Sequence, residues 1–360
     1  MKKKLLAILL AAGILLTLCP AALAAEIPAD AIAGAQKYLL ESLPRGTSGG
    51  AADHVMFTLV RSGAALPEGY ALQYYESVTA ELAENGSPAG RGRSGEFARA
   101  ALALRAMGKD PTNVCGQNLL TALADFDACA QTGLPGVLTA LRTLDCANYD
   151  IPAVDGVSTP ATRELYLSTI LNAQLPDGGW ALHGGKADAA TTASVLQALA
   201  RYRDQQQVAN AVALGVERLS ALQQDDGGYT VWSTPSSEPT AQVLLALCAL
   251  DIAVDDERFT KNGATALDKL LSYRDASGGF LGSLHPHRTA TYQALQALCA
   301  VQRAQGAQAE LYDLRDVTLT AEPELASGVK AAQLQKNGAV FSDTEAHENR
   351  DAISILGSFG

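Results

Sequence analysis

The chain has 360 residues, 48% of them hydrophobic, and a formal net charge of −11 at pH 7. An acidic chain repels phosphates, which argues against nucleic acids and anionic membrane surfaces as partners. The length exceeds one ordinary domain but suits a single large repeat domain with a tail.

The start of the chain has the pattern of a secretory signal peptide. Lysines at 2–4 precede an apolar stretch at 5–18, and the small-residue site Ala22-Leu23-Ala24 follows. These three parts predict a signal peptide at 1–24 and cleavage after Ala24. We therefore expect a secreted protein, with no transmembrane segment in the mature chain.

The first half of the mature chain predicts three hairpins, each made of an amphipathic outer helix and an apolar inner helix. The outer helices are expected at 31–43, 71–84 and 116–126, and the inner helices at 51–61, 95–107 and 134–144. Five cysteines remain after the leader, an odd number without paired spacing, so we interpret them as buried apolar residues.

The second half repeats a phrase ending in Gly-Gly-aromatic at 174–180, 223–229 and 274–280. Its aromatic residues recur about 50 positions apart, a period typical of repeat architectures. Outer helices are predicted before the phrase, at 163–174, 206–223 and 263–273, and inner helices after it, at 192–200, 240–248 and 291–299. Because these inner helices are apolar on most faces, we expect them to be buried.

The phrase itself is predicted to assemble the fold. Two adjacent glycines permit positive φ, so the chain can end the outer helix and reverse. The aromatic residue is expected to fill the gap between hairpins, while the first residue, Gln, can both donate to and accept from backbone groups. This interpretation favours a structural role for Asp177, Asp226, Trp180 and Tyr229 over a catalytic one.

Six inner and six outer helices predict an all-α fold, an α6/α6 toroid closed into a ring. The toroid is expected at 25–317, followed by a linker at 318–340 and a short C-terminal segment at 341–360.

Gln174-x-x-x-Gly178-x-Trp180 and its copy at 223–229 resemble the QW motif of squalene and hopene cyclases. Residues 31–317 as a whole resemble the prenyltransferase and squalene oxidase repeat family, in a form similar to secreted proteins of Gram-positive bacteria and to the toroid of cobalamin carriers. The resemblance implies an α/α toroid and leaves the activity open.

The last residues carry a second resemblance. Phe341, Asp343, His347, Leu356 and Gly360 have the spacing of the first half of an S-layer homology module. In that family the module binds secondary cell-wall polymer, so the resemblance implies a cell-surface association through 341–360. The alternative interpretation is a solvated helix after a loop.

The catalytic motifs of related toroids are incomplete here. The acidic pairs 225–226 and 255–257 do not complete the Asp-x-Asp-Asp or Asp-Asp-x-x-Asp motifs. Asp127-x-Cys129 with His183 has the residue types of a zinc site but lies outside the expected start of an inner helix. In Cys115-Gly116-Gln117 the Gln stands one place too early for a thioester. We therefore predict no catalytic set, no metal site and no cofactor.

The loops that lead into the inner helices converge at one end of the predicted ring and form its mouth. A concave site with aromatic and polar side chains is the usual place for a ligand. The candidate ligand-binding residues are Asp53, His54, Arg91, Arg93, Trp180, His183, Asp188, Tyr229, Trp232, His285, His287 and Arg288.

The leading hypothesis is a secreted, cell-surface-associated toroid that binds a small cofactor or a glycan in this mouth without catalysis. The first alternative is a terpenoid-cyclase-like, prenyltransferase-like or glycan-processing enzyme. The second is a structural spacer in the cell wall. A buried carboxylic acid in the cavity favours an enzyme.

Overall fold

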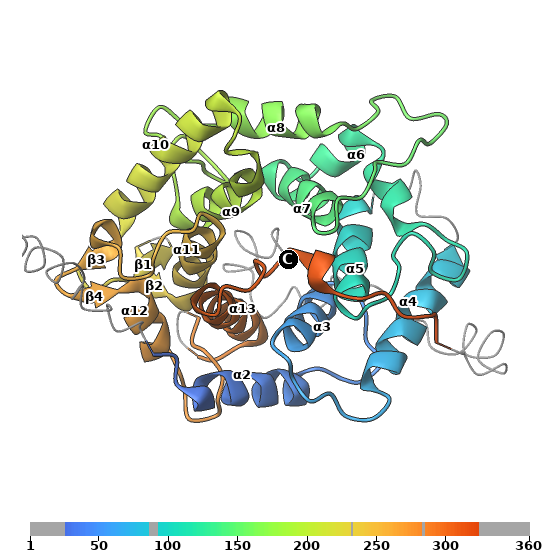
Figure 1. The fold of residues 1–360 in the computed structure, drawn as a ribbon, viewed down its shortest axis with the longest axis horizontal. Helices are drawn as coiled ribbons and strands as arrows, with labels where there is room; N and C mark the ends of the chain where they lie inside the picture. The colour runs from blue at the N-terminus through green and yellow to red at the C-terminus, as the bar shows by residue number, and fades with distance from the viewer. Residues whose placement is uncertain (1–25, 86–92, 232, 283–284, 324–360) are drawn as a thin grey trace, which may run out of the picture.

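The computed structural model describes residues 26–85, 93–231, 233–282 and 285–323. Within these residues the α-helices alternate along the chain between an inner and an outer ring (Figure 1). The inner ring contains α3 (Ala51–Arg61), α5 (Ser94–Ala106), α7 (Leu134–Asp145), α9 (Ala189–Leu199), α11 (Ser237–Ala249) and α13 (Arg288–Gln305). The outer ring contains α2 (Ala29–Ser42), α4 (Tyr70–Asn85), α6 (Phe126–Ala130), α8 (Arg163–Asn172), α10 (Gln206–Leu222) and α12 (Ala266–Ser272).

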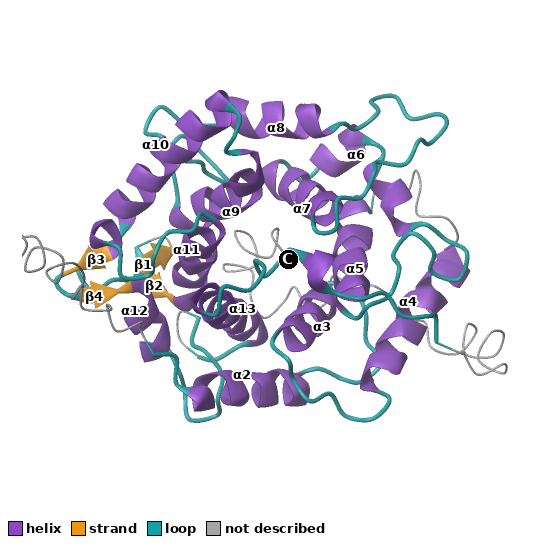
Figure 2. Cartoon of the chain, in the orientation of Figure 1, coloured by secondary structure: helices purple, strands orange, loops and turns teal. Residues whose placement is uncertain are grey.

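Short strands and turns connect the helices (Figure 2). Two antiparallel pairs lie in the second half, β1 (Tyr229–Val231) with β2 (Thr234–Ser236) and β3 (Thr260–Lys261) with β4 (Ala264–Thr265). The 3-10 segments are η1 (Leu119–Leu123), η2 (Ala200–Tyr202), η3 (Glu257–Phe259) and η4 (Leu314–Asp316). The predicted α/α toroid is therefore the observed fold.

The inner helices are buried because neighbours surround them. Every residue of α9 is buried, and α11 packs most extensively against α9 and α13, its two neighbours in the ring. An apolar helix is stable in this position because the adjacent inner helices and the outer ring cover most of its surface.

The glycine pair of each phrase is where one hairpin meets the next. The first glycine of the pair has positive φ in all three copies, at Gly178, Gly227 and Gly278. A Cβ on Gly227 would lie 2.5 Å from the carbonyl oxygen of Thr265, and one on Gly278 would lie 2.6 Å from that of Gly34. Only glycine combines this backbone geometry with so close an approach.

The other residues of the phrase fix the same contact. Gln223 donates to the carbonyl oxygens of Gly227 and Phe259, at 2.9 and 2.8 Å, so it joins its own turn to the next hairpin. The aromatic residues Trp180, Tyr229 and Phe280 are buried in the wall. Their backbone N–H groups donate to a threonine hydroxyl near the start of the following inner helix.

Ring closure uses a variation of the phrase. Where the first two copies have Gln, the third has Arg274, whose guanidinium bonds to the carboxylate of Asp30 in α2 at 2.7 Å. Tyr38 of α2 also donates to the carbonyl oxygen of Pro286 at 3.1 Å. The last hairpin is thereby joined to the first.

The outer helix predicted at 116–126 does not form. Cys115 and Gly116 both have positive φ, which no α-helix accommodates. Asn118 then caps η1, and Asp125 caps the short α6. These side chains bond the local backbone and so divide the segment into two short turns.

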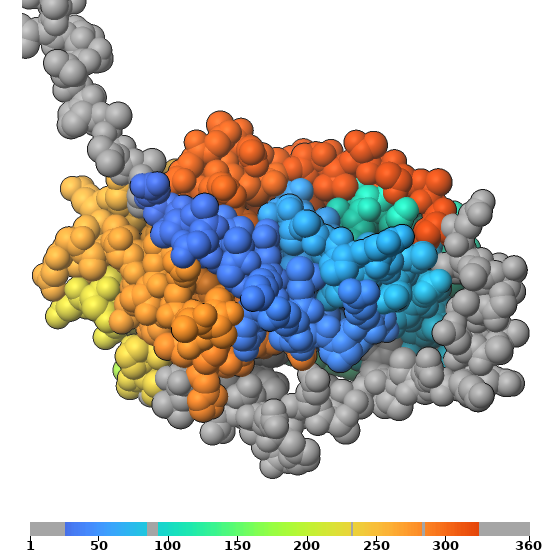
Figure 3. Space-filling view, turned by 90° about the horizontal axis from the view of Figure 1, so that it is seen from below, coloured from blue at the N-terminus to red at the C-terminus, as the bar shows by residue number. Residues whose placement is uncertain are grey.

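After α13, the segment 309–322, here called the strap, crosses the C-terminal ends of inner helices (Figure 1). In the side view of Figure 3, this orange-red part of the chain lies along one face of the ring. The N–H of Leu314 donates to the carbonyl oxygen of Cys146 at 2.7 Å, and that of Thr320 to Gly108 at 2.7 Å. The strap is therefore fixed at the ends of α7 and α5.

No helix in the described part of the chain is long and apolar enough to cross a membrane. The predicted signal peptide at 1–24, most of the predicted linker and the S-layer-like segment at 341–360 lie outside the described residues.

Candidate functional site

The space at the centre of the inner ring, here called the lumen, is bordered by a belt of amide side chains. Gln197 donates to Gln242 Oε1 at 3.1 Å, and Gln242 in turn donates to Gln293 Oε1 at 3.2 Å. Arg142 donates to Gln197 at 3.3 Å and extends the belt to α7. Amides suit this position because each can donate and accept at once.

A cavity of about 320 Å³, partly open to solvent, adjoins the belt on the side of α3, α5 and α7. Its lining combines two guanidinium groups with aromatic and polar side chains: Asp53, His54, Phe57, Arg99, Leu102, Thr139, Arg142 and Tyr312. All of these except Tyr312 come from the first half of the ring, and Tyr312 belongs to the strap.

His54 is held as a neutral ring in this cavity. It stacks on Tyr292 of α13, with ring centroids 5.0 Å apart. Burial, and then the charges of Arg99 and Arg142, lower the pKa of His54 to about 3. The imidazole therefore stays uncharged at neutral pH, and its buried Nε2 has no hydrogen-bond partner in the structure.

Asp53 is a buried acid whose bonding is half satisfied. Its Oδ1 accepts from the N–H of Gly49 at 2.9 Å and from the hydroxyl of Tyr74 at 2.7 Å. Its Oδ2 is buried without a hydrogen-bond partner. Desolvation raises the pKa of Asp53, although the charge of Arg99 opposes that shift.

A second buried acid, Glu238, lies in the first turn of α11 and is 3% exposed. It precedes Gln242 by one helical turn, so the two side chains share a helix face. Its Oε2 accepts from the Ser236 hydroxyl at 2.8 Å, while Oε1 is 3.6 Å from His287 Nε2. Desolvation raises the pKa of Glu238, and the Ser236 bond opposes it.

His287 completes a pair with Glu238 between two neighbouring inner helices. It caps α13, and its Nδ1 accepts from the N–H of Ala290 at 3.2 Å. A neutral ring that accepts at Nδ1 carries its proton on Nε2, the atom that faces Glu238. Burial, and secondly the charge of His285, lower the pKa of His287. The pair can therefore hold and exchange a proton.

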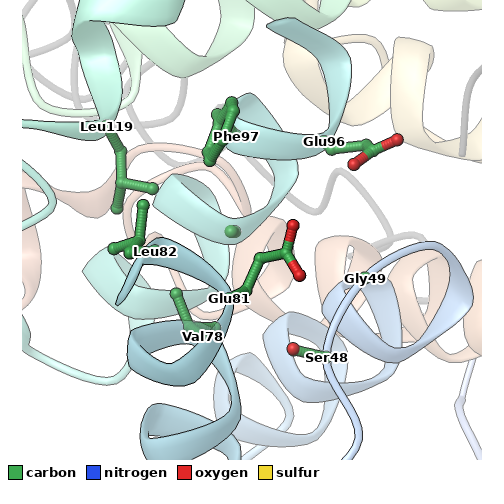
Figure 4. Close-up of a pocket in the computed structure, with 9 residues that line it drawn as sticks. Ser48, Gly49, Val78, Glu81, Leu82, Glu96, Phe97 and Leu119 are labelled. Carbon is green, nitrogen blue, oxygen red and sulfur yellow. The ribbon is translucent and has the colours of Figure 1, made fainter. Parts of the chain in front are cut away.

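Another pocket, of about 270 Å³, lies between α4 and α5 (Figure 4). Glu81 and Glu96 both extend into it. Arg93 bonds both carboxylates, with its Nη1 2.6 Å from Glu81 and its Nε 2.6 Å from Glu96. The arginine neutralises the acidic pair, so this pocket is an internally compensated ion cluster.

The predicted ligand-binding residues fall into distinct groups. Asp53 and His54 line the lumen cavity. His287 lies beside Glu238 and Arg93 bridges the second pocket. Arg288 donates to the carbonyl oxygen of Ser42. His183 and His285 are exposed. Arg91 and Trp232 lie outside the described residues.

Three further candidates serve the fold. Trp180 is 0% exposed, and its indole N–H donates to the carbonyl oxygen of Ile170 at 2.8 Å. Tyr229 is 1% exposed in the wall. Asp188 caps α9 by accepting from the N–H of Thr191 at 2.7 Å. Their contacts are with the protein itself, which corrects their placement as ligand-contacting residues.

Several lumen residues escaped the sequence-based selection: Arg99, Arg142, Gln197, Gln242, Gln293 and Tyr312. The glutamines had a detectable signal, because each is an isolated amide within an apolar inner helix. No group of three or more His, Cys, Asp or Glu side chains within the described ranges is placed to hold a metal ion.

The comparisons with known proteins agree with this architecture. The model of the prenyltransferase alpha-alpha toroid domain matches residues 136–263 and 236–353, together more than half of the chain. The chain belongs to this family. The search of curated proteins gave no match.

Solved structures show the same fold at low identity. One is described as a UGL variant with dGlcA-Glc-Rha-Glc; it has a TM-score of 0.54 and 16% identity and covers 79% of this chain and 97% of that one. Another, a possible member of the GH105 family from Salmonella enterica subsp. enterica serovar Paratyphi A, has a TM-score of 0.39 and 10% identity, covering 79% and 96%.

Proposed function

We propose that this protein is a glycan-processing toroid in which the lumen holds the end of a sugar chain and Glu238 acts as the acid. The observation that carries the proposal is the Glu238–His287 pair. Its carboxyl group is 3% exposed and has a raised pKa, beside an imidazole 3.6 Å away. An acid that stays protonated towards neutral pH is what cleavage of a glycosidic bond requires.

In this scheme Glu238 gives its proton to the leaving oxygen as the bond between that oxygen and the sugar carbon breaks. Water adds to the carbon, and the proton that it releases returns to the Glu238–His287 pair. One water is consumed and two hydroxyl groups form. His287 steadies the carboxylate while it is ionised, because its Nε2 faces Oε1.

The lumen suits a sugar better than a polyprenyl chain. Its volume of about 320 Å³ lies at the small end of ligand pockets. Amides and guanidinium groups can bond hydroxyl and carboxylate groups, and the faces of Phe57 and Tyr312 offer apolar contact. A polyprenyl ligand would leave Arg142 and the glutamine belt without polar partners. That the UGL variant of similar fold is described with dGlcA-Glc-Rha-Glc supports the choice of class.

The test is hydrolysis of a panel of oligosaccharides that end in a neutral or an acidic sugar. We expect Glu238→Gln to lower turnover by about 100-fold or more, since general acid catalysis contributes that much. Binding of the uncleaved sugar should change little because the amide keeps the size of the side chain. Glu164→Gln is the matched control, since Glu164 also lies in the first turn of a helix but is exposed. Equal turnover in both variants would remove Glu238 from the reaction.

Binding without turnover is the second candidate function. It is favoured by the state of Asp53, whose Oδ1 is committed to Gly49 and Tyr74, so that a free second carboxylate is not evident in the described part of the lumen. Paired carboxylates are the usual apparatus of glycan hydrolysis. Calorimetric binding of an oligosaccharide or a small cofactor by wild-type protein that shows no turnover would select this function.

We also propose that the protein acts outside the cytoplasm and associates with the cell wall. The sequence patterns at 1–24 and 341–360 support this location. N-terminal sequencing of protein from its source should begin at Ala25. Removal of 341–360 should release the protein from isolated cell walls; retention on the wall would contradict the anchoring role.

A further inference from the structure

The strap closes one end of the lumen with the ring of Tyr312. This ring stacks on Phe57, with centroids 4.9 Å apart and planes inclined by 12°. The guanidinium carbon of Arg142 lies 4.5 Å from the ring centroid, and the Tyr312 hydroxyl donates to Gln296 Oε1 at 3.1 Å. Tyr312 therefore contacts α3, α7 and α13 at once and forms a boundary of the cavity.

The position of Tyr312 is fixed by a latch on the strap. Arg61, at the C-terminal end of α3, donates from Nε to the carbonyl oxygen of Leu311 at 2.9 Å and from Nη1 to Asp316 at 2.9 Å. Arg303 of α13 also bonds Asp316. On either side of Tyr312, Leu311 and Leu314 are buried. A strap with this many bonds holds the aromatic ring in place in the resting protein.

We propose that Tyr312 is the floor of the lumen and a determinant of substrate length, so that the protein takes the end of a sugar chain and not its middle. The sugar part of this inference rests on the proposed function; the closure does not. A chain that enters from the inner-helix N-terminal end meets the aromatic ring and stops. Sugars beyond the depth of the cavity remain outside and gain no contacts with its walls.

The closure can be tested without any sugar by a thiol placed beside the floor. Gln296 is 2% exposed and is bonded by Tyr312. In a Gln296→Cys protein we expect slow labelling by a maleimide, followed by peptide mass spectrometry. Adding Tyr312→Ala should speed labelling at position 296 by tenfold or more, whereas Tyr312→Phe, which keeps the ring, should leave the rate unchanged.

Buried Cys129, in α6 of the outer ring, is the internal control for folding, because it should stay unlabelled in all these proteins. Equal labelling at position 296 with and without the Tyr312 ring, in protein whose Cys129 stays protected, would overturn the closure. If Tyr312→Ala also exposes Cys129, then Tyr312→Leu, which fills more of the space, replaces it and is judged by the same rates.

The length limit is tested in the Glu238→Gln background, where bound sugars are not consumed. Binding of oligosaccharides of increasing length is measured by calorimetry. With Tyr312 present, the affinity should stop rising beyond a certain length; with Tyr312→Ala, the rise should continue for at least one more sugar. The same plateau in both proteins would overturn the length role. Failure of every oligosaccharide to bind would refute the proposed function and the length role together, while the labelling result would still decide the closure.

Discussion

The two halves of the ring are joined by different means. From α8 to α13 the hairpins meet through the repeated phrase, in which a glycine approaches the next backbone and a side chain bonds across the junction. From α2 to α7 the phrase is absent, and 3-10 segment η1 with short α6 replaces a regular outer helix.

The cavity lies against the irregular half. Apart from Tyr312, its lining comes from α3, α5 and α7. In the regular half, α9, α11 and α13 present the glutamine belt and the Glu238–His287 pair. The difference teaches that the repeats specify how hairpins stack, while departures from the repeat leave room for a ligand.

The comparison predicts that a glycine of the phrase is far less replaceable than a glycine elsewhere with the same backbone. Gly227 and Gly156 have φ of 83° and 80°, but a Cβ on Gly156 meets nothing within 4 Å. Gly156→Ala should lower the free energy of unfolding by about 1–2 kcal/mol, the cost of the left-handed backbone. Gly227→Ala should lower it by about 2–5 kcal/mol, because overpacking against Thr265 is added.

Urea unfolding of the two glycine variants measures this difference. Similar losses in both would show that the close approach at the phrase contributes nothing beyond the turn, and the contrast between the two halves would lose its energetic basis.

The glutamine of the phrase should matter next. Gln223→Met keeps the approximate size of the side chain but leaves the carbonyl oxygens of Gly227 and Phe259 without their donor. We expect a loss of about 1–3 kcal/mol in the free energy of unfolding, the usual cost of a buried unsatisfied group. Gln206→Met is the control; Gln206 is exposed and bonds only the Asn210 side chain among the bonds recorded in the described residues, so its change should stay within about 0.5 kcal/mol.

The sequence predicted the fold better in the regular half, yet one inner helix of the irregular half, α3, matches its prediction residue for residue. Hydrophobic periodicity identifies such helices because burial of one face determines them. It failed at 116–126, where Cys115, Gly116, Asn118 and Asp125 bend the chain through local backbone geometry. Polar turn-forming residues within an apolar stretch were the signal against a helix.

The site was less predictable because its contacts join distant parts of the chain. Asp53 and His54 were identified by their place before an inner helix. Glu238 gains its raised pKa only through burial next to α13, which a single sequence does not show. Tyr312 belongs to a non-repetitive strap, so no periodic pattern marks it. Asp188 was taken for a mouth residue, but its bond to Thr191 shows an N-cap.

The pH dependence of stability tests the burial of Glu238. Its folded-state pKa is raised above the ordinary value, so its contribution is fully present below about pH 4.3 and is lost as the pH rises through the folded-state pKa. Glu238→Gln, which cannot ionise, should therefore gain stability relative to wild type as the pH rises across that window. Urea unfolding of both proteins from acid to neutral pH measures the difference; a constant difference would show that Glu238 ionises as freely as an exposed glutamate.

The smallest effect is expected at ring closure, where the third phrase has Arg274 in place of Gln. Asp30, its partner, is exposed, so water and salt screen the ion pair and Arg274→Gln should destabilise the protein less than Gln223→Met does. The loss should shrink further in high salt, because screening weakens the pair in wild type. Thermal unfolding at low and high ionic strength measures both effects. A loss that equals that of Gln223→Met and does not respond to salt would mean that Arg274 closes the ring through packing, as the phrase does at the other junctions.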